Sequence, residues 1–348
     1  MRILLACDRS RGHSHPALAL ARYIKTGYPQ HKIIFYGLQK DDKSFLKRQG
    51  FVCFGVDLGL RNIIIESFFY FFEALVLMIA LRPKRVFGFG GRNSFFIVLI
   101  ASFFVPAFLF EPNSTFGAAN RVLYFFVKKV FLGLKEPRKE KEVAAGIPLR
   151  DEITDIDKDR QKSSRLLNIT PDLKTILVFG GSQGSSFINN VFIETASILV
   201  KRGCEFQVIH VAGKKDFLRI NSLYKMEGIK ARVFDFYQDM GLLYSASDIV
   251  VSRSGASTLA EICFFGKPSI LVPYPHAYGH QIDNAFFLFR RKAALVFEQS
   301  FLDSRKLAQV LGDFFRGSRD FSFLEINAKN QKIWKTKKDF SEKLLSYL

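Results

Sequence analysis

A glycine-rich loop follows a buried apolar run in the second half of the sequence. Residues 175–179 read as a strand, and Gly180-Gly181-Ser182-Gln183-Gly184 follows it directly. Glycines let a backbone approach a ligand closely, and the start of the next helix attracts an anion. The loop predicts a phosphate site with Ser182 as a hydroxyl donor, and a plain strand-to-helix turn is the alternative. Because no lysine follows as in GxxxxGK[ST], a Walker-type site is not expected.

The first loop of the chain is a second candidate for chemistry. His13 stands between the first apolar run and the first helix, at the edge where parallel sheets bind ligands. A histidine with a near-neutral pKa is suited to general-base catalysis. The neighbouring Arg9 and Arg11, with Ser10 and Gly12, are candidates for clamping a diphosphate. A loop histidine that only bonds the backbone is the alternative.

A second glycine turn ends another strand of the first half. Gly88-Phe89-Gly90-Gly91 has the same strand-to-helix setting as the loop at 180–184. Gly90 and Gly91 are therefore candidates for a second phosphate site. A simple turn explains this motif somewhat better when it is taken alone.

Two polar segments follow strands of the second half. Small polar residues in Ser252–Glu261 suit a helix start, and the Glu261 carboxylate could accept both hydroxyls of a ribose. Residues 273–285 are dense in hydrogen-bonding side chains, which suits recognition of a sugar. His276 and His280 have the i, i+4 spacing of a metal pair. Since no third ligand is evident, no metal site is expected.

These loops need a scaffold in which short strands alternate with helices. Strands are expected at residues 3–7, 33–37, 85–89, 107–110, 175–179, 206–211, 249–252 and 269–272. The alternation predicts an α/β protein with two Rossmann-like, doubly wound parallel domains. We expect a first domain at 1–147, a second at 148–324 and a lysine-rich helix at about 325–348.

Charge and aromatic content restrict the partners. The net charge is +19 with 39 Phe, and residues 1–150 carry 23 Lys and Arg against 10 Asp and Glu. This composition excludes a disordered chain, and four widely spaced cysteines exclude a disulfide scaffold and suit a reducing compartment. A basic, Phe-rich chain suits an anionic membrane surface or nucleic acid. Because no nucleic-acid-binding signature is present, we expect no nucleic acid partner.

The apolar segment at 63–81 is nearly long enough to span a bilayer. Its Glu66, Tyr70 and Glu73 follow i, i+4, i+7 spacing and share one helical stripe. Acids are costly at the bilayer centre. We therefore expect an amphipathic helix that binds an anionic membrane surface through residues 61–85, with a buried core helix and a membrane span as alternatives. A second basic, aromatic helix is expected at 121–135.

Six motifs in order resemble the MurG family of bacterial glycosyltransferases. GGSQG at 180–184 and HQIDNA at 280–285 match the family patterns, and GIPLR at 146–150 is similar to GNPVR. Three further segments are similar to family patterns: GFGG at 88–91 to GxGGY, residues 111–121 to EQNxxxGxxN, and residues 236–262 to the DM…RSGAxTxxE segment. One motif alone would be weak evidence for the family, whereas six motifs in the same order are strong evidence and cover nearly the whole chain.

The resemblance implies a GT-B fold with a cleft between two domains. It implies an N-terminal domain that binds acceptor and membrane, a C-terminal domain that binds UDP-GlcNAc, and a terminal helix that packs back on the first domain. The implied reaction moves GlcNAc, with inversion, from UDP-GlcNAc to the muramyl C4 hydroxyl of undecaprenyl-diphosphate-linked MurNAc-pentapeptide. This step converts lipid I to lipid II in peptidoglycan synthesis, at the cytoplasmic face of the plasma membrane. No metal and no cofactor are implied.

The resemblance also assigns roles by position. His13 becomes the base, Glu261 contacts ribose, and a backbone group at Tyr237 reads uracil. The residues assigned to the donor are Asn113, Arg150, Gly181, Ser182, Gly184, Tyr237, Arg253, Ala256, Ser257, Thr258, Leu259, Ala260, Glu261, Gln281 and Asn284. Within this set, Arg150 and Ser182 are assigned to the diphosphate, and Asn113, Gln281 and Asn284 to the GlcNAc hydroxyls. The residues assigned to the acceptor diphosphate are Arg9, Ser10, Arg11, Gly12, Gly90 and Gly91.

The departures from the family pattern lie in the acceptor half. The family's GGTGGH reads here from Asp8 to His13 as DRSRGH, Arg92 replaces the Tyr of GxGGY, and Pro112 replaces the Gln of EQN. Arginine side chains would then replace the glycine loop's amide groups around a diphosphate. The alternatives are a different lipid or glycan acceptor, a UDP-GlcNAc epimerase or hydrolase, and, outside enzymes, a non-catalytic scaffold for cell-wall assembly or a nucleic-acid-binding protein.

Overall fold

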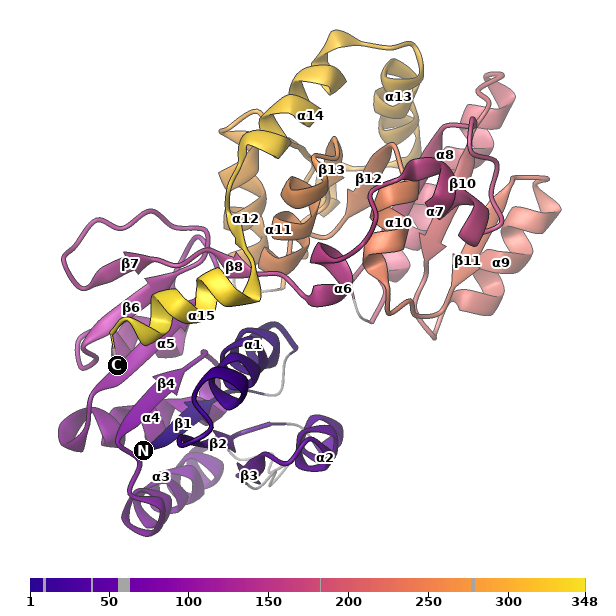
Figure 1. Ribbon diagram of the computed structural model, residues 1–348. Coiled ribbons are helices and arrows are strands. Elements are labelled where there is room, and N and C mark those ends of the chain that lie inside the picture. Colours follow the sequence, from indigo (N-terminus) through magenta and orange to yellow (C-terminus); the bar gives the residue numbers. More distant parts are fainter. Residues whose placement is uncertain (9–10, 39, 56–62, 182, 277–278, 348) are drawn as a thin grey trace. The chain divides into compact units, whose positions relative to one another are not determined.

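The computed structural model divides the chain into two compact units (Figure 1). It describes residues 1–8, 11–38, 40–55, 63–181, 183–276 and 279–347. The first unit is Met1–Arg150 with Lys335–Leu348, and the second is Asp151–Trp334. The first unit therefore runs to Arg150 rather than 147, and the chain re-enters it at Lys335 rather than at about 325.

The first unit is built on a sheet of seven strands, each of which pairs in parallel with its neighbours. In spatial order they are β3 (Val52–Phe54), β2 (Lys32–Tyr36), β1 (Arg2–Ala6), β4 (Arg85–Gly88), β5 (Ala107–Glu111), β6 (Lys129–Leu132) and β7 (Glu142–Ala144). The central strands are apolar on both sides because helices cover both faces. Polar loops are consequently confined to the strand ends.

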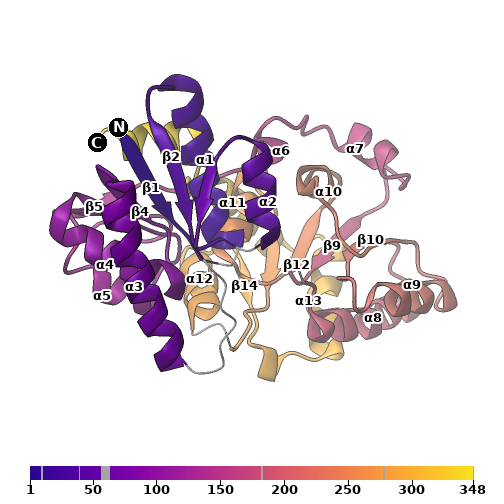
Figure 2. The same cartoon turned by 90° about the horizontal axis from the view of Figure 1, so that it is seen from below.

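Helices cover the two faces of this sheet in separate groups (Figure 2). One face carries α1 (Arg11–Gly27), α2 (Lys40–Arg48) and α15 (Lys337–Leu345), and the other carries α3 (Ile63–Leu81), α4 (Arg92–Phe104) and α5 (Ala118–Leu123). Alternate side chains of β1 point to opposite faces of the sheet: Ile3 and Leu5 pack in the core under the first group of helices, whereas Leu4 and Ala6 pack in the core under the second.

Helix α3 has the predicted bounds, but, unlike an ordinary surface helix, it turns its polar side chains toward the protein and exposes apolar ones. Glu66 and Tyr70 are each 2% exposed, so the polar stripe faces the protein. The exposed apolar side chains on α3 and its neighbours, here called the Phe-rich face, are Ile65, Phe68, Phe69, Phe71, Phe72, Val76, Ile79, Phe103, Phe104, Val122, Phe125 and Phe126. No described helix is both long and apolar enough to cross a membrane.

The helix expected at 121–135 is wrong. Helix α5 ends at Leu123, and Lys129–Leu132 forms strand β6 between β5 and β7. Val130, Phe131 and Leu132 are fully buried there. A short apolar run inside a covered parallel sheet has no alternation to separate it from a helix, which explains the error.

The second unit has a six-stranded parallel sheet. In spatial order its strands are β11 (Ala231–Phe234), β10 (Gln207–Val211), β9 (Thr175–Phe179), β12 (Ile249–Ser252), β13 (Ser269–Leu271) and β14 (Leu295–Val296). Its helices are α6 (Asp151–Thr154), α7 (Arg160–Leu166), α8 (Ser186–Lys201), α9 (Phe217–Met226), α10 (Met240–Ala246), α11 (Ala256–Phe265), α12 (His280–Phe289), the 3-10 helix η1 (Gln299–Phe301), α13 (Ser304–Phe315) and α14 (Arg319–Asn330). Two Rossmann-like parallel sheets confirm the predicted α/β class.

The C-terminal segment belongs to both units. Helix α14 lies in the second unit, while α15 lies against α1 in the first (Figure 1). Phe340 of α15 is fully buried and meets Phe110 edge-on, and the Tyr23 hydroxyl donates to Glu342. Between them, β15 (Trp334–Lys335) pairs with β8 (Ile147–Pro148). The single predicted helix at 325–348 is therefore two helices.

Candidate functional site

The predicted phosphate loop joins β9 to α8 in the second unit. Gly181 has φ +92° with open space where a side chain would project. Gly184 has φ +78°, and a Cβ there would lie 2.3 Å from the Ala212 carbonyl oxygen. Ser185 then caps α8, because its side chain accepts from the Ile188 amide. At Gly184 the loop therefore packs against the end of β10, whereas at Gly181 its backbone is open to a ligand. The loop precedes a helix of sixteen residues, whose N-terminus attracts anions.

Arg253 connects the loops at the carboxyl ends of the second sheet. It is 7% exposed, and one guanidinium nitrogen donates to the carbonyls of Val272 (3.0 Å) and Pro273 (3.1 Å). The other donates to Ser185 Oγ (2.8 Å) and Gln299 Oε1 (2.9 Å). Burial lowers the pKa of the guanidinium to about 10, so it stays charged at neutral pH. In this structure Arg253 positions loops.

Two other predicted sugar-reading residues also hold these loops together. Ser254 Oγ donates to the Gln281 carbonyl at 2.7 Å, and the buried Asn284 amide donates to the Ser254 carbonyl at 3.3 Å. The Gln281 side-chain oxygen accepts from the Tyr274 amide at 3.0 Å. The starts of α11 and α12 are therefore fixed to each other, and Gln281, which is half-buried, lies at this junction.

Glu261 lies within α11 and is 8% exposed. The Tyr244 hydroxyl donates to its Oε2 at 3.1 Å, and the Tyr244 ring stacks on Phe265. In the predicted uridine segment, Leu259 and Ala260 are fully buried and Ala256 is nearly so, while Ser257 and Thr258 are half-buried. Tyr237 packs against Phe234, and burial raises the pKa of its hydroxyl.

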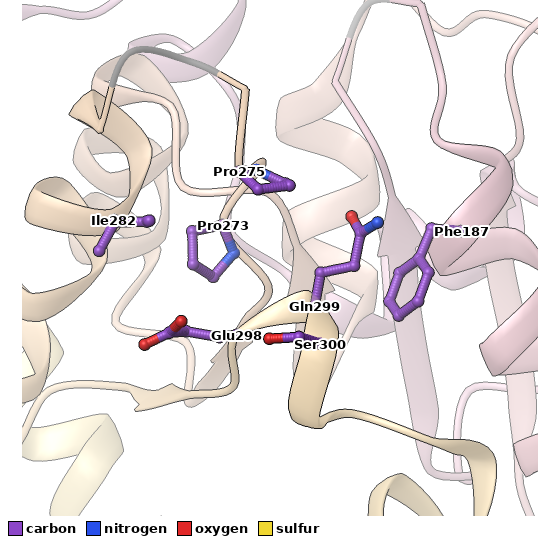
Figure 3. A pocket seen from close by; sticks show the side chains of 7 residues that line it. All are labelled: Phe187, Pro273, Pro275, Ile282, Glu298, Gln299 and Ser300. Carbon is purple, nitrogen blue, oxygen red and sulfur yellow. The ribbon is translucent and has the colours of Figure 1, made fainter.

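A cavity of about 230 Å³ borders this loop cluster (Figure 3). Its lining residues are Phe187, Pro273, Pro275, Ile282, Glu298, Gln299 and Ser300. Gln299 and Phe187 lie on one side of it and Ile282 on the other. Because Pro273 and Gln299 are also partners of Arg253, the cavity is continuous with the cluster that Arg253 ties together.

A buried polar network supports the phosphate loop from behind. His210 of β10 is fully buried, with Nδ1 2.9 Å from the Tyr224 hydroxyl and Nε2 3.0 Å from Asn189 Oδ1. The Asn189 amide donates to the Ala212 carbonyl and to Asp216, which also accepts from the Ser186 hydroxyl at 2.6 Å. Since Gly184 packs on Ala212, this network fixes the backbone that borders the loop.

We expect the unfolding free energy to fall on acidification because of His210. Burial lowers its pKa from 6.5 to about 3, with Asp216 opposing the shift. The unfolded chain therefore binds a proton that the folded chain does not between these values, and this contribution is lost as the pH falls below 6.5. At pH 5 the loss is about 2 kcal/mol. Urea unfolding at pH 5 and 7.5 measures it, and the non-titrating His210→Gln should depend less on pH. Equal pH dependence in both proteins contradicts the assignment.

Glu111 organises the polar loop after β5 in the first unit. It is 2% exposed and accepts from the Asn113 amide (3.1 Å) and Asn113 side chain (2.9 Å). The Gly117 amide and the Asn120 side chain donate to its other oxygen at 2.9 and 3.0 Å. Asn113, a predicted donor contact, is thus positioned by a buried carboxylate that spans the motif.

The glycine turn at the start of α4 is tightly packed. Gly90 and Gly91 have φ +94° and +90°, and the Ser94 hydroxyl donates to both of their carbonyls. The Arg92 amide donates to the Asp8 carboxylate at 3.0 Å. The two glycines assigned to the acceptor therefore lie beside an acid of the first loop.

Several predicted residues lie outside what the structure describes. Arg9, Ser10 and Ser182 are not among the described residues, and Arg11, Gly12 and His13 are placed by backbone only, in the first turn of α1. Arg150 ends the first unit, directly after Leu149, whose amide donates to the Lys335 carbonyl. Within the described part of the chain, no group of three or more His, Cys, Asp or Glu side chains is arranged to hold a metal ion.

The motifs do not predict the residues that position the site. Glu111 lies within a motif, and its spacing to Asn113, Gly117 and Asn120 is the one signal of its role. Tyr244, Gln299 and the His210 network carry no local signal, because their partners lie far along the chain.

Comparisons with known proteins support a glycosyltransferase. Residues 175–344 match the family described as "Glycosyltransferase family 28 C-terminal domain". The "UDP-N-acetylglucosamine--N-acetylmuramyl-(pentapeptide) pyrophosphoryl-undecaprenol N-acetylglucosamine transferase" of Thermodesulfovibrio yellowstonii is 34% identical over 330 residues, covering 89% of each chain. The enzyme of the same name from Myxococcus xanthus is 32% identical over 328 residues, 89% of this chain and 84% of its own.

Solved structures agree on the fold. The crystal structure of Acinetobacter baumannii MurG superposes with a TM-score of 0.81 at 21% identity, covering 100% of this chain and 99% of that one. The UDP-GlcNAc 2-epimerase of Neisseria meningitidis gives a TM-score of 0.69 at 12% identity, covering 99% and 100%. At these identities the structures establish the GT-B fold alone.

Proposed function

This chain belongs to the MurG family of UDP-GlcNAc-dependent hexosyltransferases, and from that membership we infer both its reaction and the roles of its residues. The reaction transfers GlcNAc from UDP-GlcNAc to undecaprenyl-diphosphate-linked MurNAc-pentapeptide, which converts lipid I to lipid II in peptidoglycan synthesis. The observation that carries the assignment is a similarity that runs through both units. It covers the acceptor half, where the motifs depart, as well as the donor half.

The donor side of the proposal rests on the loops of the second unit. The loop at 180–184 and the start of α8 offer amide groups and a helix dipole to the leaving UDP. Glu261 receives the ribose, and Gln281 reads GlcNAc hydroxyls together with Asn113. Arg253 and Asn284 act indirectly, since their side chains bond the backbone of these loops.

The chemical step needs one base. In the proposed mechanism the His13 imidazole takes the proton of the acceptor's C4 hydroxyl as that oxygen attacks the anomeric carbon. The bond from this carbon to the UDP oxygen breaks, the configuration inverts, and the electron pair leaves on the UDP phosphate. UDP-GlcNAc is a substrate, and the mechanism uses no cofactor or metal.

Transfer from labelled UDP-GlcNAc to a short-chain lipid I analogue tests the function. We expect label in the lipid and UDP release that requires the acceptor. Donor turnover without acceptor would indicate an epimerase or hydrolase, and transfer only to another lipid or glycan would indicate a different acceptor. Donor binding without turnover on any acceptor would indicate a scaffold.

We also propose a peripheral position at the cytoplasmic face of the plasma membrane. Monomers rarely expose apolar patches of the extent of the Phe-rich face. Ring contacts connect its elements: the Phe103 and Phe126 rings are 5.8 Å apart, and Phe71 of α3 lies 6.1 Å from the half-buried Phe96 of α4. Beside Phe125 lies a hollow of about 570 Å³ that Lys128, Lys129, Lys139 and Lys141 help to line. Apolar side chains beside lysines suit an anionic lipid surface.

The double variant Phe104→Ser/Phe125→Ser should bind vesicles of phosphatidylglycerol and phosphatidylcholine at least about tenfold more weakly, since each buried Phe contributes about 1.5–3 kcal/mol. These side chains are 74% and 76% exposed, so their loss should not affect folding. Vesicle sedimentation measures the binding, which should also weaken with salt. Phe301→Ser/Phe323→Ser in the second unit, also exposed, is the matched control. An equal loss in both pairs would contradict the proposal.

A further inference from the structure

The N-terminus of α4 already carries a carboxylate of this chain. The Arg92 amide, the first of the helix, donates to Asp8 Oδ2 at 3.0 Å. Gly91 makes this approach possible, because a Cβ at that position would lie 2.0 Å from Asp8 Cβ. Asp8 is therefore seated directly against the glycine turn, where its charge meets the positive end of the helix dipole.

The cation at this helix start is also bonded to an acid. The Arg92 guanidinium donates to Glu66 Oε2 at 2.6 Å, and the Glu66 side chain is only 3% exposed. The Tyr70 hydroxyl donates to the other Glu66 oxygen at 3.1 Å. Both the amide and the side chain of Arg92 are thus bonded to carboxylates.

A phosphate at this helix end would have to displace Asp8 or lie against it. Helix N-termini bind phosphate through the same amide groups that a capping carboxylate uses. Two anions a few ångströms apart repel each other. The Asp8 carboxylate is thus a built-in competitor for any diphosphate that approaches Gly90 and Gly91.

We propose that Asp8 determines how the acceptor is recognised, by excluding the acceptor's diphosphate from the start of α4. The inference rests on the proposed function. It changes one expectation derived from the motifs: Gly90 and Gly91 form the seat of Asp8 and not a phosphate site. The acceptor's phosphates are then left to side-chain charge, for which the sequence offers Arg9 and Arg11.

Asp8→Asn is the deciding variant, because Asn caps a helix as well as Asp but carries no charge. Geranyl diphosphate is the probe, titrated calorimetrically into protein saturated with UDP, so that the donor's diphosphate site is filled. We expect Asp8→Asn to bind the probe about 3–30-fold more tightly than the unchanged chain. Asp8→Gly, which restores the family's glycine, should bind at least as tightly as Asp8→Asn. The KM for the lipid I analogue should fall in parallel, with the KM for UDP-GlcNAc unchanged.

Asp339→Asn is the matched control, since it removes one exposed carboxylate from the same unit. It should leave probe binding unchanged, and thermal unfolding should show that all three variants fold. Equal or weaker binding of the probe by Asp8→Asn would overturn the inference, as would an equal gain in Asp339→Asn. The binding arm needs no turnover, so failure of the inference is distinct from failure of the chain to glycosylate lipid I.

Discussion

His13→Ala should lower kcat for GlcNAc transfer by about 10²–10⁴-fold, the contribution of a general base. The C4 hydroxyl of the acceptor is a weak nucleophile, and without a base its proton has no acceptor at the moment of attack. Binding of UDP-GlcNAc should be little changed, because the donor loops belong to the second unit and His13 to the first. Steady-state kinetics with the short-chain lipid I analogue, together with calorimetric titration of UDP, measure the two effects separately.

The pH profile distinguishes a base from a structural histidine. In the unchanged protein kcat/KM should fall at acidic pH, because a protonated imidazole cannot accept the proton of the acceptor hydroxyl. The residual activity of His13→Ala should lack this acid limb. His31→Gln, which replaces a partly exposed histidine of the same unit, should keep both rate and profile. Full activity in His13→Ala would remove the base assignment.

Arg253→Met should destabilise the second unit by about 3 kcal/mol and raise the KM for UDP-GlcNAc at least about tenfold. The substitution leaves the Val272 and Pro273 carbonyls without their buried donor, and each unsatisfied buried group costs about 1–3 kcal/mol. The loops after β9, β12 and β13 lose their common partner, so the residues proposed to bind UDP-GlcNAc are no longer held in one arrangement. Urea unfolding and calorimetric titration of UDP measure the two losses.

Arg316→Met is the control for this substitution. Arg316 lies in the same unit, 71% exposed, and its ion pair with Asp313 is on the surface, so about 0–1 kcal/mol is expected. Arg253→Lys should be intermediate, since lysine keeps the charge but not the planar fork that reaches four acceptors. A large rise in KM with unchanged stability would instead mean that Arg253 contacts the donor directly, as the motif resemblance assigns.

The central strands were predictable because burial on both faces leaves a clear apolar run. Strands β9 and β12 have the predicted bounds, residues 175–179 and 249–252. The short strands β3 and β14 are partly exposed and have three and two residues, so no apolar run predicts them. The sequence predicts a helix in place of β6, because the apolar run there has no period.

Helix α3 shows that periodicity does not predict which face of a helix is buried. The spacing of Glu66, Tyr70 and Glu73 correctly predicts that they share a stripe. Which stripe faces inward depends on Arg92 and Tyr36, the partners of Glu66 and Glu73, and these lie on other elements. The same limit applies to the site: motifs identify Arg253 and Asn284, but only the folded chain shows that their side chains hold backbone.

The return of α15 to the first unit has a consequence for the order of folding during synthesis. Phe340 and Leu344 are fully buried in a core whose other members lie before residue 146. Those two side chains are translated only after the whole of Asp151–Trp334. The second unit, being continuous in the chain, can complete its core while translation proceeds, whereas the first must wait with part of its apolar interior uncovered. The Phe-rich core of the first unit is therefore completed only after α15 has been translated.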